Sequence, residues 1–132
     1  MAVIIDLRSR TPIYEQIINN IKEQALSGAL KPDEQIPSIR QLTREIGINP
    51  NTIHKAYAEL ERQGVIYSLA GRGAFISSQP EMQKLADAKR EELLRDIENT
   101  LVSAKKLDVE RADVEKIVDK VYNDSESESD RS

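Results

Sequence analysis

The chain has 132 residues, a formal net charge of −4, no cysteine and a single histidine, and its length predicts one domain or one domain with an appendage. The absence of cysteine excludes disulfides and thiolate metal sites, and one imidazole cannot build a histidine-rich metal site. No run is apolar enough for a signal peptide or a membrane span, which predicts a cytoplasmic protein without membrane contact.

The first predicted helix begins at Thr11-Pro12 and ends at Ser27-Gly28. Threonine is a favoured N-cap, and proline suits the first turn. Glycine at position 28 fits the left-handed conformation in which many helices end. The apolar stripe of this helix consists of Ile13, Ile17, Ile21 and Leu26.

A short helix is predicted after Pro37, over residues 38–46. Ser38 and Gln41 form a capping box, because the serine oxygen can accept from the Gln41 amide while the Gln41 side chain reaches back to the Ser38 amide. Gly47 fits the left-handed stop at the end of this helix.

A second helix follows after only residues 47–49. Asn49 is the predicted N-cap, Pro50 occupies the first helical position, and Gly64 ends the helix. Helices joined by so short a turn cross steeply, which points the N-terminal end of the second helix outward. That end carries Asn49, Asn51, Thr52, His54 and Lys55.

A small β-hairpin is predicted next, with strands over 65–67 and 74–76. Gly71 and Gly73 allow the reversal between them, because glycine adopts positive φ without strain. Two helices around a tight turn followed by such a hairpin predict a winged helix-turn-helix, which presents one helix to the DNA major groove and a loop beside it. The predicted fold class is mainly α with a small β-hairpin.

The remainder of the chain predicts helices without a core of their own. Ser-Ser-Gln-Pro at 77–80 marks a boundary between a DNA-binding domain over 1–79 and a two-helix region over 80–123. Amphipathic helices of this kind need a partner, and the simplest is a second copy related by a two-fold axis. The acidic segment 124–132 is predicted to be a disordered tail. The predicted dimerisation residues are Leu85, Leu93, Leu94, Ile97, Leu101, Val114, Ile117, Val118 and Val121.

Several motifs occur in one order along the chain: Pro-Ile-Tyr-Glu-Gln-Ile at 12–17, Gly-Ala-Leu-Lys-Pro-Asp-Glu-Gln-Ile-Pro at 28–37, Pro-Ser-Ile-Arg-Gln-Leu at 37–42, Asn-Pro-Asn-Thr-Ile-His-Lys-Ala-Tyr at 49–57, Leu-Glu-Arg-Gln-Gly-Val-Ile at 60–66 and Gly-Arg-Gly-Ala-Phe-Ile at 71–76. Together they resemble the GntR family of bacterial transcription regulators, over about residues 8–78. The short remainder is similar to the YtrA-type branch of that family.

This resemblance implies a sequence-specific transcription regulator, not an enzyme, that binds a two-fold symmetric DNA operator as a homodimer, with repression favoured over activation. By likeness to the YtrA-type branch, the regulated genes would encode a membrane transporter. No catalytic residue, cofactor or metal ligand is predicted, because no nucleophile with a base, paired carboxylates or P-loop occurs in the chain. Whether a small-molecule effector binds, and whether transcription rises or falls, stays open.

Individual residues of the predicted DNA face have competing interpretations. Arg40 lies beside a helix N-terminus, where a cation opposes the macrodipole unless a phosphate is bound, and the resemblance implies a DNA contact for it. Arg44 can instead pair with Glu45 or Glu23. Asn49 is first an N-cap, whereas Asn51 faces outward and asparagine suits bidentate bonding to adenine. The complete predicted set is Ser38, Arg40, Arg44, Asn49, Asn51, Thr52, His54, Lys55, Gly71, Arg72 and Gly73.

Residues of the wing tip and of the second helix can also be explained by structural roles alone. Glycines around Arg72 serve any hairpin, but family likeness implies that this tip enters the minor groove, where negative potential is strong. Tyr57 is predicted to belong to the core.

Net acidity is unusual for a DNA-binding protein, whose affinity comes largely from neutralising phosphates. The charges are unevenly distributed: residues 1–79 hold nine basic and eight acidic side chains, and 80–132 hold ten and fifteen. A single subunit is therefore expected to bind DNA weakly, and a dimer doubles its basic contacts. The alternative is a winged helix used only for protein contacts. The polar end at 49–55 argues against it, because protein interfaces expose aromatic or broad apolar patches.

Overall fold

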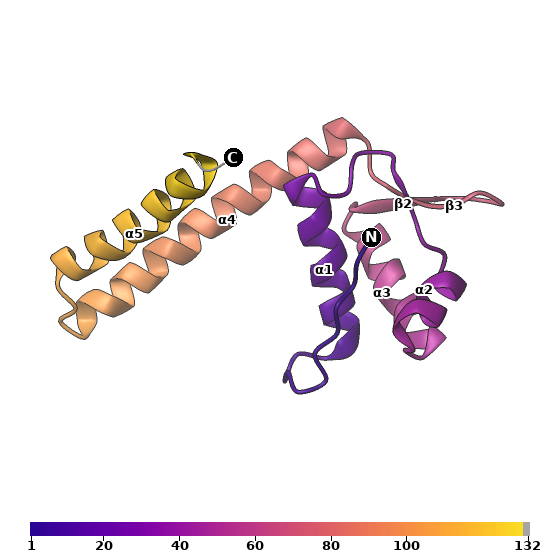
Figure 1. Ribbon diagram of the computed structural model, residues 1–132, viewed down its shortest axis with the longest axis horizontal. Helices are drawn as coiled ribbons and strands as arrows, with labels where there is room; N and C mark the ends of the chain where they lie inside the picture. The colour runs from indigo at the N-terminus through magenta and orange to yellow at the C-terminus, as the bar shows by residue number, and fades with distance from the viewer. Residues whose placement is uncertain (131–132) are drawn as a thin grey trace. The chain divides into compact units, whose positions relative to one another are not determined.

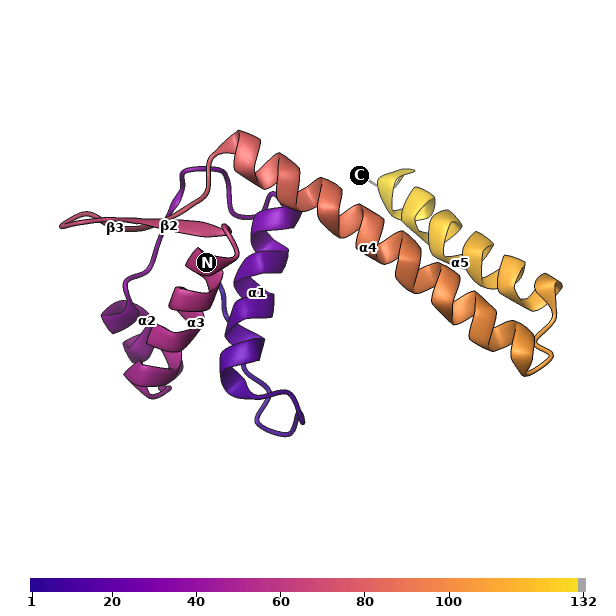
Figure 2. The same cartoon turned by 180° about the vertical axis from the view of Figure 1, so that it is seen from behind.

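The computed structural model describes residues 1–130, with side chains up to residue 124. It divides into a compact unit over Met1–Lys89 and a second unit from Arg90 onward. Figure 1 shows the elements along the chain, and Figure 2 shows them from behind. They are α1 (Ile13–Ser27), β1 (Gln35–Ile36), α2 (Ile39–Ile46), α3 (Pro50–Arg62), β2 (Ile66–Leu69), β3 (Gly73–Ile76), α4 (Gln79–Lys106) and α5 (Arg111–Asp130).

The helix-turn-helix forms through the caps that the sequence predicts. The Ser38 Oγ accepts from the Gln41 amide at 3.1 Å, and the Ser38 amide donates to the Gln41 Oε1 at 2.9 Å. Gly47 ends α2 with a φ of 67°. Asn49 then caps α3, because its Oδ1 accepts from the Asn51 amide at 2.8 Å. The predicted capping box and N-cap are confirmed.

The start of α1 differs from the prediction. Pro12, and not Thr11, occupies the N-cap position, and no side chain caps the helix. The side chain of Gln16 binds the preceding loop from within the helix, where its Nε2 donates to the Thr11 carbonyl at 2.9 Å. The other end follows the prediction, with Gly28 left-handed at a φ of 85°.

The predicted hairpin forms from β2 and β3, and an additional short strand, β1, joins it in a three-stranded antiparallel sheet of order β1-β3-β2. The additional strand β1 pairs Gln35 with Phe75, and Tyr67 of β2 pairs with the other side of Phe75. The two aromatic rings stack with centroids 5.5 Å apart. The Tyr67 hydroxyl donates to Asp33 Oδ1 at 3.0 Å, and this hydrogen bond raises the pKa of Tyr67. A strand of two residues is too short to show the alternation of apolar and polar residues by which strands are predicted.

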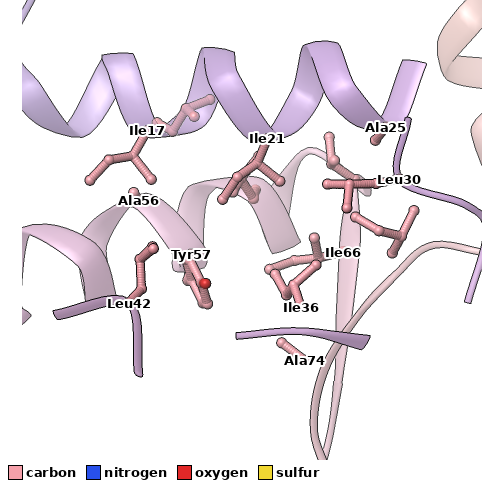
Figure 3. Packing of buried hydrophobic residues seen from close by; sticks show 14 of the residues in the cluster. Ile17, Ile21, Ala25, Leu30, Ile36, Leu42, Ala56, Tyr57, Ile66 and Ala74 are labelled. Carbon is pink, nitrogen blue, oxygen red and sulfur yellow. The ribbon is translucent and has the colours of Figure 1, made fainter. Parts of the chain in front are cut away.

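The hydrophobic core lies between α1, α2, α3 and the inner face of the sheet (Figure 3). Tyr57 is buried in this core, as predicted, and its hydroxyl donates to the Pro37 carbonyl at 2.7 Å. Burial, with a smaller effect from Glu45, raises the pKa of Tyr57. The largest fully buried side chains are Ile17, Ile21, Leu42, Ile53, Leu60, Val65 and Ile76.

The first turns of α4 belong to this unit. Met82 is 6% exposed within the core, and Leu85 packs against it. For this reason the unit extends to Lys89, beyond the domain boundary expected at 79/80. Leu85, included in the predicted dimerisation set, therefore packs within its own chain.

The second unit consists of helices whose apolar side chains lie mostly in solvent. The second half of α4 and α5 run side by side (Figures 1 and 2), joined by a turn at Asp108 with a φ of 60°. Val114 is half-buried, but the remaining members of the predicted set on these helices are exposed: Leu93, Leu94, Ile97, Leu101, Ile117, Val118 and Val121. The helical backbone of α5 continues to Asp130, into the segment expected to be disordered. Residues 131–132 of that tail lie outside the described residues.

Met82→Ala tests whether α4 helps to hold the first unit together. Shortening a buried methionine removes apolar contacts and leaves a cavity, so the free energy of unfolding of the first unit should fall by about 2 to 5 kcal/mol. Urea unfolding followed by circular dichroism measures this change. Gln83→Ala, at the exposed neighbouring position, is the control and should change stability by less than about 0.5 kcal/mol. Equal effects of both substitutions would contradict the packing role of Met82.

Candidate nucleic-acid interface

The helix α3 presents opposite faces to the core and to solvent. Its inner face is buried through Ile53, Ala56, Tyr57 and Leu60. Its outer face is exposed at Asn51, His54, Lys55 and Ala58, and Thr52 is half-buried. Of the α3 side chains predicted to meet DNA, Asn51, His54 and Lys55 thus lie on the exposed outer face. Asn49 lies at the start of the helix with its side-chain oxygen already bound to the Asn51 amide, as its interpretation as an N-cap requires.

A groove of about 440 Å³ lies between α3, the start of α2 and the hairpin of β2 and β3. Ser38, His54 and Arg72 all line it, although they come from three separate elements. Gly71 and Gly73 line the same groove, and so does Glu61 from the last turns of α3. The structure thereby brings the predicted wing-tip residues together with part of the predicted α3 set.

The wing tip is held by a residue that the sequence patterns did not single out. Gln35 of β1 donates from Nε2 to the Arg72 carbonyl at 2.8 Å. The tip turns through Gly71 and Gly73, with φ values of 75° and 112°. A Cβ on Gly73 would lie 2.9 Å from the Gln35 Nε2, so a larger residue there would displace the Gln35 amide, and the positive φ itself favours glycine. The Arg72 side chain is exposed. Only the pairing of β1 with β3 places Gln35 here, and no local pattern could have revealed it.

Arg40 and Arg44 are exposed on α2 and do not line the groove beside the wing. Within the described part of the chain, neither arginine has an ion-pair partner, so the expected alternative of Arg44 pairing with Glu45 or Glu23 does not form. Arg44 lies in the last turn of its helix, where the macrodipole favours a cation. Arg40 lies in the first turn, where the macrodipole disfavours one. Its charge is consequently available to an anion.

A second groove, of about 630 Å³, lies on the other flank of α3, between α3 and α1. Lys55 extends over the ring of Tyr14, with its Nζ 4.0 Å from the ring centroid. This cation–π contact fixes the ammonium group at the rim of the groove. Ala58 borders both grooves, so α3 forms a ridge between them.

Of the two acidic residues that line this groove, Glu15 and Glu59, the second is paired with a cation. Glu59 accepts hydrogen bonds from the Arg62 Nε at 2.8 Å and from the Gln63 Nε2 at 3.0 Å. The bond from Arg62, followed by that from Gln63, lowers the pKa of Glu59 to about 2. Gln63 also accepts from Lys22 Nζ of α1 at 3.1 Å.

Metal sites and membrane spans are both absent from the described residues. Among them, no group of three or more His, Cys, Asp or Glu side chains is placed to hold a metal ion. No helix within residues 1–130 has the length and apolar character to cross a bilayer.

Comparison with known proteins identifies the family. The sequence model of the bacterial regulatory proteins of the gntR family matches residues 13–76. The HTH-type transcriptional repressor YtrA of Bacillus subtilis is 58% identical over 73 residues, which are 55% of this chain and 56% of YtrA. The match thus spans little more than half of that repressor. The HTH-type regulator YhcF of Bacillus subtilis is 33% identical over 90 residues, covering 68% of this chain and 72% of YhcF.

Solved structures extend the likeness to most of the chain. A transcriptional regulator from Oenococcus oeni superposes with a TM-score of 0.74 at 30% identity, covering 89% of this chain and 97% of the other. The DNA-binding domain of AraR, solved in complex with operator ORX1, superposes with a TM-score of 0.52 at 30% identity, covering 58% of this chain and 96% of the other. By its winged helix-turn-helix and by these matches, the chain belongs to the GntR family of bacterial transcription regulators.

Proposed function

We propose that this chain is a transcriptional repressor that binds a two-fold symmetric DNA operator as a homodimer. The observation that carries the proposal is the ridge of α3, whose exposed polar end adjoins the groove lined by Ser38, His54 and Arg72. A helix of this kind, with a flanking loop, has the dimensions that the major groove and its neighbouring minor groove accommodate.

In this proposal α3 enters the major groove. The amide of Asn51 suits adenine, and Thr52 can meet a phosphate or a thymine methyl. His54 and Lys55 lie about one turn further along the helix and contact bases or phosphates beside it. We also keep Ser38 and Arg44 of the α2 region and Asn49 at the start of α3 among the proposed DNA-binding residues.

The flanking elements fix the position of α3. Arg40 meets a phosphate or base edge at the start of α2, where an anion relieves its conflict with the macrodipole. The tip at 71–73 enters the minor groove, where glycine permits close approach of the backbone and the Arg72 guanidinium meets strong negative potential. The operator complex of the AraR domain supports this arrangement, because that domain shares the fold at 30% identity. The repressor named YtrA supports repression over activation.

The homodimer is supported by the apolar side chains of the second unit. Leu94 is 67% exposed and Ile97 is 56% exposed, and Val121 of α5 is similarly accessible. Monomeric proteins rarely expose so many large aliphatic side chains on one pair of helices. A second copy would cover them by an isologous contact. The likeness to YtrA further extends the proposal to genes for a membrane transporter as the regulated operon.

Selection of bound sequences from a random duplex pool, at two salt concentrations, tests the function. A two-fold operator should emerge as an inverted repeat, with affinity that falls steeply as salt rises, because phosphate contacts release counterions. Recovery of no sequence above background at low salt would contradict the proposal and favour a module for protein contacts.

Arg40→Ala should abolish specific binding to the selected operator. One charged contact at the DNA is worth about 1.5 to 3 kcal/mol, so its removal from both subunits should weaken binding at least about 100-fold. Fluorescence anisotropy with labelled operator measures the change, and circular dichroism should find the helical content unchanged. Arg40→Lys is the matched variant, because lysine keeps the charge but not the bidentate guanidinium. Wild-type operator affinity in Arg40→Ala would rule out the proposed role of this residue.

Ile97→Asp should dissociate the dimer. Placing a carboxylate in each half of an apolar interface removes about 2 kcal/mol of burial per subunit, which raises the dimer dissociation constant at least about 100-fold. Sedimentation equilibrium across protein concentrations measures it. Glu98→Ala, at the adjacent exposed position, should leave the dimer intact. A dimer that survives Ile97→Asp unchanged would mean that these helices are not the interface.

A further inference from the structure

The chain before α1 lies extended along that helix (Figure 1) and is fastened to it by a row of amide side chains. Gln24 donates to the Ala2 carbonyl at 2.7 Å, and Asn20 donates to the Ile4 carbonyl at 3.4 Å. Gln16 accepts from the Asp6 amide at 2.8 Å and donates to its carbonyl at 3.0 Å. These amide residues are one helical turn apart, and they bind alternate residues of the extended segment.

The loop between this segment and α1 is ordered by its own hydrogen bonds. The Asp6 Oδ1 accepts from the Arg8 amide at 2.9 Å, and the Ser9 Oγ accepts from the Thr11 amide at 3.1 Å. The loop carries Arg8 and Arg10, which are both exposed. Across the described residues, neither guanidinium has an ion-pair partner. The loop thus holds two exposed cations on a backbone that is already fixed.

The position of the loop relates it to α3. It leads directly into the first turn of α1, where Tyr14 contacts Lys55 of α3 at 4.0 Å. In both Figures 1 and 2 the loop lies at the same end of the first unit as the turn between α2 and α3. The groove beside the wing lies on one flank of α3, and the groove beside α1 lies on the other. The loop that carries Arg8 and Arg10 therefore leads into the α1 side of α3, whereas Arg72 lies on the side of the wing.

A helix in the major groove has a phosphate strand on each side. The wing serves one side in the proposed function, and on the other side Lys55 is the cation of α3 at the rim of the groove. We propose that Arg8 and Arg10 bind backbone phosphates of the operator along that second strand, beside Lys55. Guanidinium groups match phosphate oxygens in a bidentate manner. This inference rests on the proposed DNA-binding function.

The acidic groups of this flank differ in how far their charge is offset: Glu59 has a cationic partner, whereas Glu15 and Asp6 accept hydrogen bonds and keep their negative charge. Glu59 is already paired with Arg62, and Glu15 accepts from the Tyr14 hydroxyl at 3.3 Å. Asp6 binds the Arg8 amide within the loop. The phosphate therefore approaches the rim formed by Lys55 and the arginines and does not enter the groove between α1 and α3. The helix-turn-helix and wing, residues 37–73, carry five basic and three acidic side chains. Arg8 and Arg10 would add two more cations per subunit to the DNA contact.

The double variant Arg8→Gln with Arg10→Gln in the full chain tests the inference on the operator recovered by selection. Affinity should fall about tenfold or more, and the slope of log affinity against log salt should become shallower by about 0.9 for each phosphate that the variant no longer neutralises. The preference for operator over random duplex should not change, because phosphate contacts carry no sequence information. Both arginines are exposed, so the thermal unfolding midpoint should stay at the wild-type value.

The matched control is Lys105→Gln with Lys106→Gln, which removes the same charge from the last turn of α4 and should leave the salt slope unchanged. Arg8→Lys with Arg10→Lys should restore most of the slope. Wild-type affinity and slope in the arginine double variant would overturn the inference and leave the proposed function standing. An equal decrease in the lysine control would also overturn it, by assigning the effect to net charge. Failure of the wild-type chain to bind any duplex would overturn the proposed function and this inference together.

Discussion

The burial of one face of α3 is the constraint on which the interface depends. Ile53, Ala56 and Leu60 are fully buried in a core shared with α1 (Figure 3), and the Tyr57 hydroxyl is bound to the Pro37 carbonyl just before α2. These contacts fix the rotation of α3 about its own axis. Because residues three and four apart share a helical face, a fixed inner face also fixes the outer one. Specificity for a base sequence needs a fixed outer face, because a helix that could rotate would not present the same side chains to the bases.

Local chemistry explains why this part of the molecule could be predicted. The capping box of Ser38 and Gln41, the cap at Asn49 and the left-handed Gly47 each need only neighbours within a few residues. Their combination leaves almost no freedom in where α2 ends and α3 begins. The exposed face of α3 follows from its apolar stripe, so most of its polar residues could be named from the sequence.

The parts that sequence patterns missed depend on contacts between distant residues. Gln35 supports the wing only because β1 pairs with β3. The role of Gln16 depends on the loop before α1, which folds back onto its side chain. Met82 illustrates the same limit at the boundary between units, since Ser-Ser-Gln-Pro resembles a linker while the next turn of helix completes the core. In each case the deciding partner lies on another element, and no periodicity within one segment encodes it.

The charge distribution explains how a chain of net charge −4 suits an acidic polymer. At physiological salt an exposed charge is felt over only about 8 Å, so DNA responds to the groups that it touches and not to the total. Arg40, Arg72 and Lys55 are exposed around the ridge of α3, whereas the excess of acidic residues lies after residue 79. In the proposed complex, such a surface offers each subunit only a few phosphate contacts. Affinity would then depend on how many cations reach the backbone at once, and for this reason the proposed second subunit and second flank of α3 would matter more than the overall charge.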